Sequence, residues 1–151
     1  MQAYRIADAR HPIFDPTGAA LNGGRWNSVG KRVIYASESY AAAMLEVLAH
    51  RNASTLPKHH KYVRIFIPDS LAIENVLPRD LQGWDDDNSL VAQVFGDGWY
   101  DSLRTPVLRV PSTVTHGPEY NLVLNTTHPE FRLIEAAEPV PVAWDSRLLE
   151  R

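Results

Sequence analysis

The hydrophobic period of the chain switches from alternation to about 3.6 residues near Ser37. Residues 31–37 alternate between two faces rich in β-branched and aromatic types, which predicts a strand. Its faces consist of Val33 with Tyr35 and of Ile34 with Ala36. Residues 38–51 then predict a helix behind a cap at Ser37 or Ser39. The apolar residues at helical spacing are Tyr40, Met44, Val47 and Leu48.

The remaining strand-type segments are short and are bounded by Pro, Asn or Gly, namely residues 61–68, 106–112, 120–125 and 131–136. Residues 138–144 are expected to form an edge strand or a closing extended segment, because proline cannot donate to a central ladder. Residues 89–103 predict one or two short helices interrupted at Gly96–Gly98, and the preceding DDDN sequence can supply the N-terminal cap. The pattern predicts an α+β (mixed α/β) domain with a largely antiparallel or mixed sheet.

Length and composition limit the classes of protein that remain. A chain of 151 residues predicts one domain over residues 1–151. No apolar run approaches the roughly 20 residues that span a bilayer, and the N-terminus lacks the pattern of a secretory signal. With no cysteine to suggest an oxidising compartment, we expect a cytoplasmic protein.

Charge and motifs exclude several further functions. A net charge of -3 with scattered arginines argues against direct nucleic-acid binding, but one or two arginines can still hold a small phosphorylated ligand. G-x-G-x-x-G, the ATPase phosphate loop and G-x-S-x-G are all absent, as is a cysteine nucleophile. The adjacent His59 and His60 diverge and lack an H-E-x-x-H context, so we expect a solvated loop there and no metal site.

Four polar residues remain as candidates for chemistry: Arg25, Tyr35, Glu46 and Ser112. Glu46 interrupts an apolar helical segment, and its neighbours one turn away are mostly alanines, which leaves room for a ligand. The residues alone leave purely structural roles open for all four. Glu46 can be the boundary residue of an amphipathic helix, Arg25 can pair with a surface carboxylate, Tyr35 can fill the core, and Ser112 can begin a turn.

Read in order, five segments resemble the RES domain family: YRI, GAALNGGRWNSVGKRVIYAS, AAAMLEVLAH, LRVPS and EYNLVLNTTHPEF. The Arg, Glu and Ser that name the family correspond to Arg25, Glu46 and Ser112, and the resemblance runs from Tyr4 to about Leu133. One departure affects only local loop geometry, since the asparagine that the family commonly follows with proline is separated here from Pro129 by three residues.

The resemblance implies the toxin of a bacterial toxin–antitoxin pair, with a fold similar to the ADP-ribosyltransferase toxins. NAD+ is then a substrate, and no cofactor is expected. Family members hydrolyse or phosphorolyse NAD+, or transfer its ADP-ribose to a protein. A non-catalytic module that binds NAD+ or a partner is a third class. The implied partner is a helical antitoxin with a DNA-binding region that covers the NAD+ entrance, and we expect a homodimer within that complex.

The resemblance also suggests a role for each candidate. Glu46 would stabilise the ribosyl cation and bind a ribose hydroxyl. Arg25, with the backbone amides of the preceding glycines, would bind the pyrophosphate, and Tyr35 would stack on nicotinamide. The further expected contacts with substrate are Ser112 and Asn125 to ribose or phosphate, and Arg5 and Lys31 to phosphate. Trp26 is assigned to packing.

Overall fold

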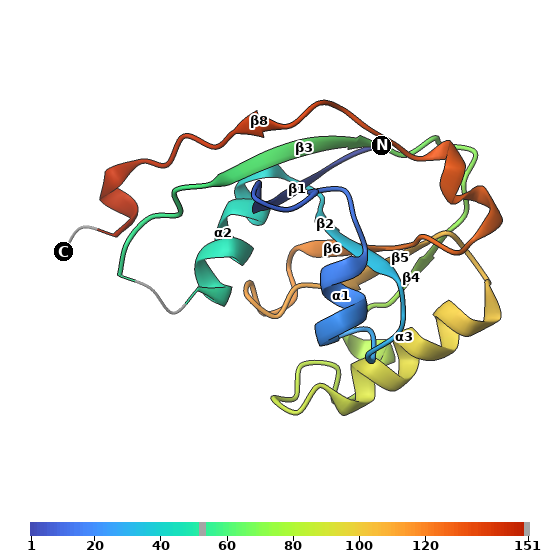
Figure 1. The fold of residues 1–151 in the computed structure, drawn as a ribbon. Coiled ribbons are helices and arrows are strands. Elements are labelled where there is room, and N and C mark those ends of the chain that lie inside the picture. The colour runs from blue at the N-terminus through green and yellow to red at the C-terminus, as the bar shows by residue number, and fades with distance from the viewer. Residues whose placement is uncertain (52–53, 150–151) are drawn as a thin grey trace.

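The strand-type segments form one sheet in the computed structural model, which describes residues 1–51 and 54–149 (Figure 1). In these residues the sheet has eight strands in the order β4-β5-β6-β2-β1-β3-β7, with β8 also paired to β3. Neighbours run antiparallel except β4 and β5, so the predicted largely antiparallel sheet is confirmed. The strands are β1 (Gln2–Asp8), β2 (Val33–Ser37), β3 (His60–Phe66), β4 (Ile73–Asn75), β5 (Val107–Pro111), β6 (Tyr120–Asn125), β7 (Glu135–Ala136) and β8 (Val140–Pro141).

The alternation along β2 divides the core into two clusters, as the sequence predicts. Ile34 and Ala36 belong to the cluster on one face of the sheet. Val33 and Tyr35 belong to the other face or pack against it, where α3 (Leu90–Ser102) supplies the fully buried Trp99. An indole buried to this extent contributes roughly 1.5–3 kcal/mol through the apolar area it removes from water.

The helix α2 (Tyr40–His50) begins where the sequence predicts. Of the two expected caps, Ser39 is the one used, and its hydroxyl accepts a hydrogen bond from the Ala42 N–H at 3.0 Å. The ring of Tyr40 contacts Tyr4 of β1 and Tyr62 of β3 edge-on, with ring centroids 5.9 and 4.9 Å away. These contacts place α2 across the β1 side of the sheet, next to α1 (Thr17–Asn22) and apart from α3 (Figure 1).

The sheet opens between β1 and β2, which share one residue pair, Tyr4 with Ser37, among the described residues. Arg5 lies in this opening and donates from Nε to the Ile13 carbonyl at 2.7 Å and from Nη1 to the Tyr35 carbonyl at 2.9 Å. Burial lowers the pKa of this guanidinium. Arg5 therefore donates to two backbone carbonyls in an opening where no neighbouring strand supplies the donors.

Two predicted elements are wrong in detail. The helix α3 runs through Gly96–Gly98 without a break, because Gly96 lets the helix approach the Trp26 backbone closely. Its first turn uses the Asn88 side chain, which accepts from the Leu90 N–H at 3.0 Å. Residues 131–136 are not one strand, because a 3₁₀ turn over Pro129–Leu133 precedes the short β7. Sequence reasoning also did not single out β1, α1 or β4 as elements.

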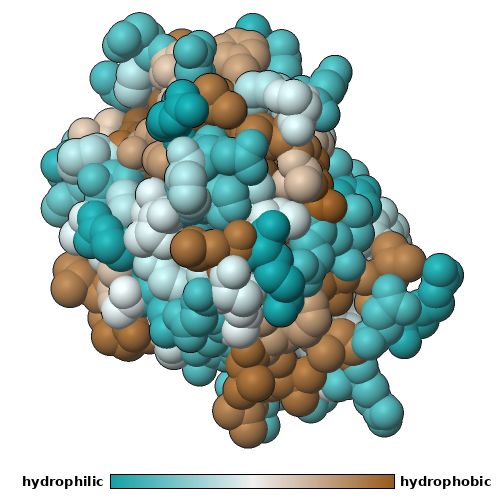
Figure 2. Space-filling view, turned by 90° about the vertical axis from the view of Figure 1, so that its right-hand side faces the viewer, coloured by the Kyte–Doolittle hydropathy of each residue, from teal (hydrophilic) through white to brown (hydrophobic). Residues whose placement is uncertain are grey.

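The chain ends against the edge of the sheet, as its prolines predict. After β7 it runs along β3 and pairs there as β8, before a 3₁₀ turn at Ser146–Leu148 (Figure 1). On the face shown in Figure 2, hydrophobic residues lie in separate groups among hydrophilic ones. In residues 1–51 and 54–149 no helix combines the length and apolar character needed to cross a membrane.

Gly96→Ala should destabilise the protein, whereas Gly98→Ala on the same helix should not. A Cβ at position 96 would lie 1.8 Å from the Trp26 carbonyl oxygen, a backbone atom that no rotamer change can move away. We expect a loss of about 1–3 kcal/mol of unfolding free energy or more. At Gly98 nothing lies within 4 Å, so alanine should add up to about 1 kcal/mol. Urea denaturation of both variants measures the difference, and equal effects would contradict this packing.

Candidate active site

A cavity of about 440 Å³ lies where β1 and β2 separate. Its walls come from β1, α1 and the following glycine turn, β2, α2, and the ends of β5 and β6. Four predicted site residues, Arg5, Arg25, Tyr35 and Glu46, line it together. The volume is in the range of pockets that hold small-molecule ligands.

A second cavity, of about 470 Å³, lies at the end of β3 and contains none of the predicted site residues. Its ionisable side chains, Asp69 and Glu135, are both acidic and both exposed. Such a lining offers no side-chain cation to a phosphorylated ligand. The cavity at the β1–β2 opening is therefore the candidate site.

The Glu46 carboxylate is held by one oxygen. Its Oε1 accepts hydrogen bonds from the Ser112 hydroxyl and from Nδ2 of Asn121, each at 2.8 Å. Nδ1 of the His50 imidazole lies 3.6 Å from Oε2. This arrangement fixes the carboxylate plane and leaves one oxygen free for a ligand in the cavity.

Ser112 stands behind the carboxylate. The residue is 3% exposed and is not part of the cavity wall, and its hydroxyl donates to Glu46. In the structure Ser112 thus contacts Glu46, and its expected contact with ribose or phosphate stays a prediction. This donor keeps the carboxylate oriented.

Asn121 is a site residue that sequence reasoning missed. It pairs with Ser37 across β2 and β6, and its Oδ1 accepts from the Ser37 hydroxyl at 3.0 Å while Nδ2 donates to Glu46. The available signal was the alternation of β6, which puts Asn121 on the same face of the sheet as Val123. A polar residue on that apolar face indicates a buried partner.

The Arg25 guanidinium is oriented by hydrogen bonds to the loop at residues 84–86. Its Nη1 donates to the carbonyls of Trp84 at 3.1 Å and Asp86 at 2.8 Å. Among the described residues Nε and Nη2 have no hydrogen-bond partner. Two donors of a planar fork therefore remain available to an anion in the cavity.

The turn that carries Arg25 is fixed by Tyr35. The phenol accepts from the Trp26 N–H at 3.1 Å and donates to Oδ1 of Asn27 at 2.6 Å, and burial raises its pKa. Gly24 is required beside it, because a Cβ there would lie 2.7 Å from the phenol oxygen. The hydroxyl therefore holds the turn, while the ring lines the cavity. Stacking of this ring on nicotinamide stays a prediction.

Trp26 is buried in the core and contacts Phe95, in agreement with its assignment to packing.

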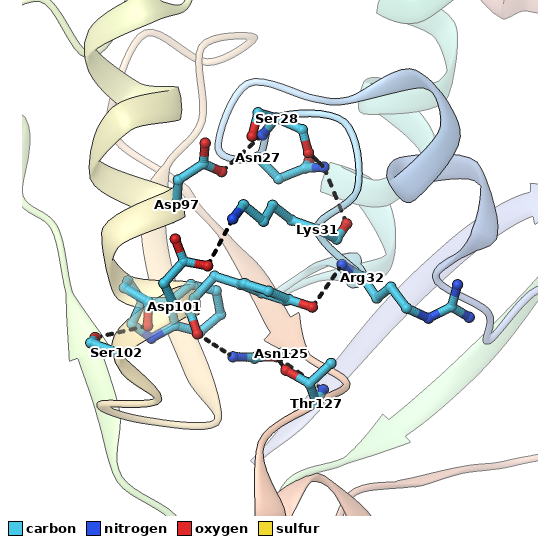
Figure 3. A network of polar contacts seen from close by, with 11 residues as sticks. Asn27, Ser28, Lys31, Arg32, Asp97, Asp101, Ser102, Asn125 and Thr127 are labelled. Carbon is cyan, nitrogen blue, oxygen red and sulfur yellow. Dashed lines mark hydrogen bonds and ion pairs between the residues drawn. The ribbon is translucent and has the colours of Figure 1, made fainter.

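Lys31 and Asn125 lie outside the cavity wall, in the polar network of Figure 3 that joins the turn to α3. Nζ of Lys31 pairs with Asp101 at 2.7 Å. Asn125 is fully buried, and its Nδ2 donates to the Tyr100 carbonyl at 3.1 Å while Oδ1 accepts from Thr127. These partners use their polar groups, and the expected contacts of both residues with substrate stay predictions. Arg5 lines the cavity, but Nε and Nη1 serve the two carbonyls in the sheet opening, so its phosphate contact stays a prediction.

Comparison with known proteins identifies relatives along nearly the whole chain. The family model described as the RES domain matches residues 2–145. A Sphingobium sp. (strain YBL2) protein named Prs ADP-ribosylating toxin is 37% identical over 156 residues, covering 98% of this chain and 96% of its own. A Yersinia enterocolitica protein named Toxin Res is 33% identical over 156 residues, with 98% and 99% coverage.

A solved structure has the same fold. A chain in the crystal structure of the M. tuberculosis MbcT–MbcA toxin–antitoxin complex superposes with a TM-score of 0.73 at 23% identity. The match covers 92% of this chain and 82% of that chain. This likeness confirms the expected mixed α+β fold.

Tyr35→Phe should destabilise the protein by about 1–3 kcal/mol, because the Trp26 N–H and the side-chain Oδ1 of Asn27 lose their shared partner. Tyr4→Phe is the matched control, since the Tyr4 hydroxyl has no hydrogen bond to any described residue, and its cost should stay within about 0.5 kcal/mol. Urea unfolding of both variants measures the costs. If the two were equal, the turn would not depend on the Tyr35 hydroxyl.

The same experiment at high pH tests the raised pKa of Tyr35. Above about pH 10 the unfolded state releases this proton before the folded state does, so stability falls as the pH rises. The fall should be shallower in Tyr35→Phe than in Tyr4→Phe.

Proposed function

The chain belongs to the RES domain family, and on that basis we propose that it is the toxin of a bacterial toxin–antitoxin pair that cleaves the nicotinamide–ribose bond of NAD+. One observation carries this proposal. Glu46, with one carboxylate oxygen unheld, lines the same cavity as Arg25, two of whose donors have no partner among the described residues. A carboxylate for the sugar and a guanidinium for the phosphates are the two charges this reaction requires.

The reaction needs electrostatic stabilisation more than acid catalysis. When the bond breaks, the electron pair leaves with nicotinamide, which becomes neutral, and positive charge develops on the ribose. Oε2 of Glu46 would face that charge or a ribose hydroxyl. Because Ser112 and Asn121 hold Oε1, the carboxylate would need to reorient little as positive charge develops on the ribose.

The glycine turn would receive the diphosphate. Arg25 would donate from Nε and Nη2, with its Nη1 kept in place by the carbonyls of Trp84 and Asp86. The Tyr35 ring, which lines the cavity, would stack on nicotinamide and contribute about 1 kcal/mol together with orientation.

The acceptor distinguishes two candidate activities. Water or phosphate as acceptor gives NAD+ glycohydrolase or phosphorylase activity, which is our first proposal. A protein acceptor gives mono-ADP-ribosyltransferase activity, and the name of the 37% identical Sphingobium relative, an ADP-ribosylating toxin, favours this second candidate. Both begin with the same bond cleavage. A module that only binds NAD+ would release no nicotinamide.

A cognate antitoxin is part of the proposal. Support comes from the solved structure with the same fold, which belongs to a toxin–antitoxin complex. We expect a helical antitoxin with a DNA-binding region that covers the cavity mouth, and a homodimer of this chain within the complex.

The products identify the reaction. Purified protein is incubated with NAD+ alone, with inorganic phosphate, and with a cell extract, and mass spectrometry follows the ADP-ribose moiety. Free ADP-ribose indicates hydrolysis, its phosphate ester phosphorolysis, and modified protein transfer. If no nicotinamide appears in any arm, the proposed function is wrong.

Glu46→Ala should fold and lose nicotinamide release by orders of magnitude, because the developing ribosyl charge loses its counter-ion. Glu138→Ala, at an exposed glutamate outside the cavity wall, is the control and should behave as wild type. Initial rates of nicotinamide release compare the variants. Turnover at the wild-type rate by Glu46→Ala would contradict the proposed role of the carboxylate.

Arg25→Ala should chiefly weaken NAD+ binding, and Arg25→Lys should restore little of it. A lysine cannot bond the Trp84 and Asp86 carbonyls and also present a planar pair of donors to phosphate. Calorimetric titration with NAD+ measures the affinities, with Arg132→Ala at an exposed position as the control. Equal affinity in Arg25→Ala and wild type would contradict the assigned role.

A further inference from the structure

His50 is the last residue of α2 and lines the cavity beside Glu46. Its side chain is 74% exposed, so the imidazole stands between the cavity and solvent. Nδ1 lies 2.7 Å from the backbone carbonyl oxygen of Glu46 and 3.6 Å from Oε2 of the same residue. The imidazole is thus next to the one carboxylate oxygen that no donor holds.

The hydrogen bond to the carbonyl sets the tautomer of the ring. A carbonyl oxygen can only accept, so Nδ1 must carry the hydrogen. In the neutral ring Nε2 then has the lone pair, and no described residue donates to it. A base with a defined lone pair therefore stands on the solvent-exposed part of the cavity wall.

We propose that His50 is the general base that takes the proton from the hydroxyl group capturing the ribosyl cation. The inference rests on the proposed function and deepens it by naming the class of acceptor. The bond from C1′ of the ribose to nicotinamide breaks and its electron pair leaves with nicotinamide. The hydroxyl oxygen bonds to C1′, and its proton passes to Nε2 of His50 and then to solvent.

Glu46 is less suited to this proton transfer. Its Oε1 already accepts two hydrogen bonds, from Ser112 and Asn121, so this oxygen is engaged by the protein. Its Oε2 is already assigned to the ribose, where it would face the developing positive charge or a hydroxyl. His50 is the remaining described base on the cavity wall beside that oxygen.

The acceptors that need this base are neutral hydroxyls: water, or the hydroxyl of a protein side chain. Phosphate dianion attacks through an oxygen that is already deprotonated, so it has no proton to give up at this step. Loss of His50 should therefore slow capture by water and leave capture by phosphate nearly unchanged. When capture by water slows, nicotinamide returns to the ribosyl cation more often.

A helix-end contact would explain the carbonyl bond without any chemistry, because histidine commonly bonds the last carbonyls of a helix. His50→Asn separates the two roles, since its Nδ2 can keep the donor where Nδ1 stood while Nε2 is lost. His50→Ala removes both. His11→Asn, at an exposed histidine outside the cavity wall, is the matched control.

The experiment measures hydrolysis of NAD+ and, in parallel, exchange of isotope-labelled nicotinamide into NAD+. In His50→Asn we expect hydrolysis to fall by about 100-fold and the ratio of exchange to hydrolysis to rise at least about tenfold. Phosphorolysis should stay within about threefold of the wild-type rate, and added imidazole should restore hydrolysis by His50→Ala. His11→Asn should match wild type throughout.

An unchanged ratio in His50→Asn would overturn the assignment, whatever the variant does to stability, and would leave a helix-end role only. A rise in the ratio that imidazole does not reverse in His50→Ala would also count against a base. If the wild type releases no nicotinamide, the proposed function itself fails, and this outcome is separate from an unchanged ratio in an active enzyme.

Discussion

The opening of the sheet between β1 and β2 determines where everything else in the site can be. The two strands share one described pair, Tyr4 with Ser37, and both then contribute to the cavity wall. An open seam in a sheet leaves backbone carbonyls without donors, which is costly when they are buried. Arg5 removes this cost by donating to a carbonyl of β2 and to the carbonyl of Ile13 in the segment that follows β1. The fold can therefore keep a cavity inside a sheet instead of at its edge.

The two charges that meet in the cavity are supported in different ways. Glu46 is held by neutral side chains of β5–β6, through Ser112 and Asn121, so that its charge stays available. Arg25 is held by backbone carbonyls, and its turn is fixed by the Tyr35 hydroxyl. In both cases one part of the group is engaged by the protein and another part is left for a ligand. This division holds each charged group in a fixed orientation before a ligand binds, which is what preorganisation means.

Local pattern in the sequence predicts the elements whose period is clean, such as the alternation of β2 and the cap of α2. It fails where tertiary contact decides. The break expected at Gly96 is absent because Trp26 packs on that glycine. Asn121 and Asn125 share a face of β6, but only the packing of α2 and α3 decides that Asn121 reaches Glu46 while Asn125 serves Tyr100. The family resemblance placed Arg25 and Glu46, and it could not show that Ser112 stands behind the carboxylate.

Glu46 also has an architectural task. The helix that carries it rests on β1, and its carboxylate bonds to residues at the ends of β5 and β6, so one side chain fastens the two sides of the seam. Loss of this acceptor would weaken the attachment of α2 to β5 and β6 without unfolding the protein. Glu46 therefore supports the architecture as well as the proposed chemistry.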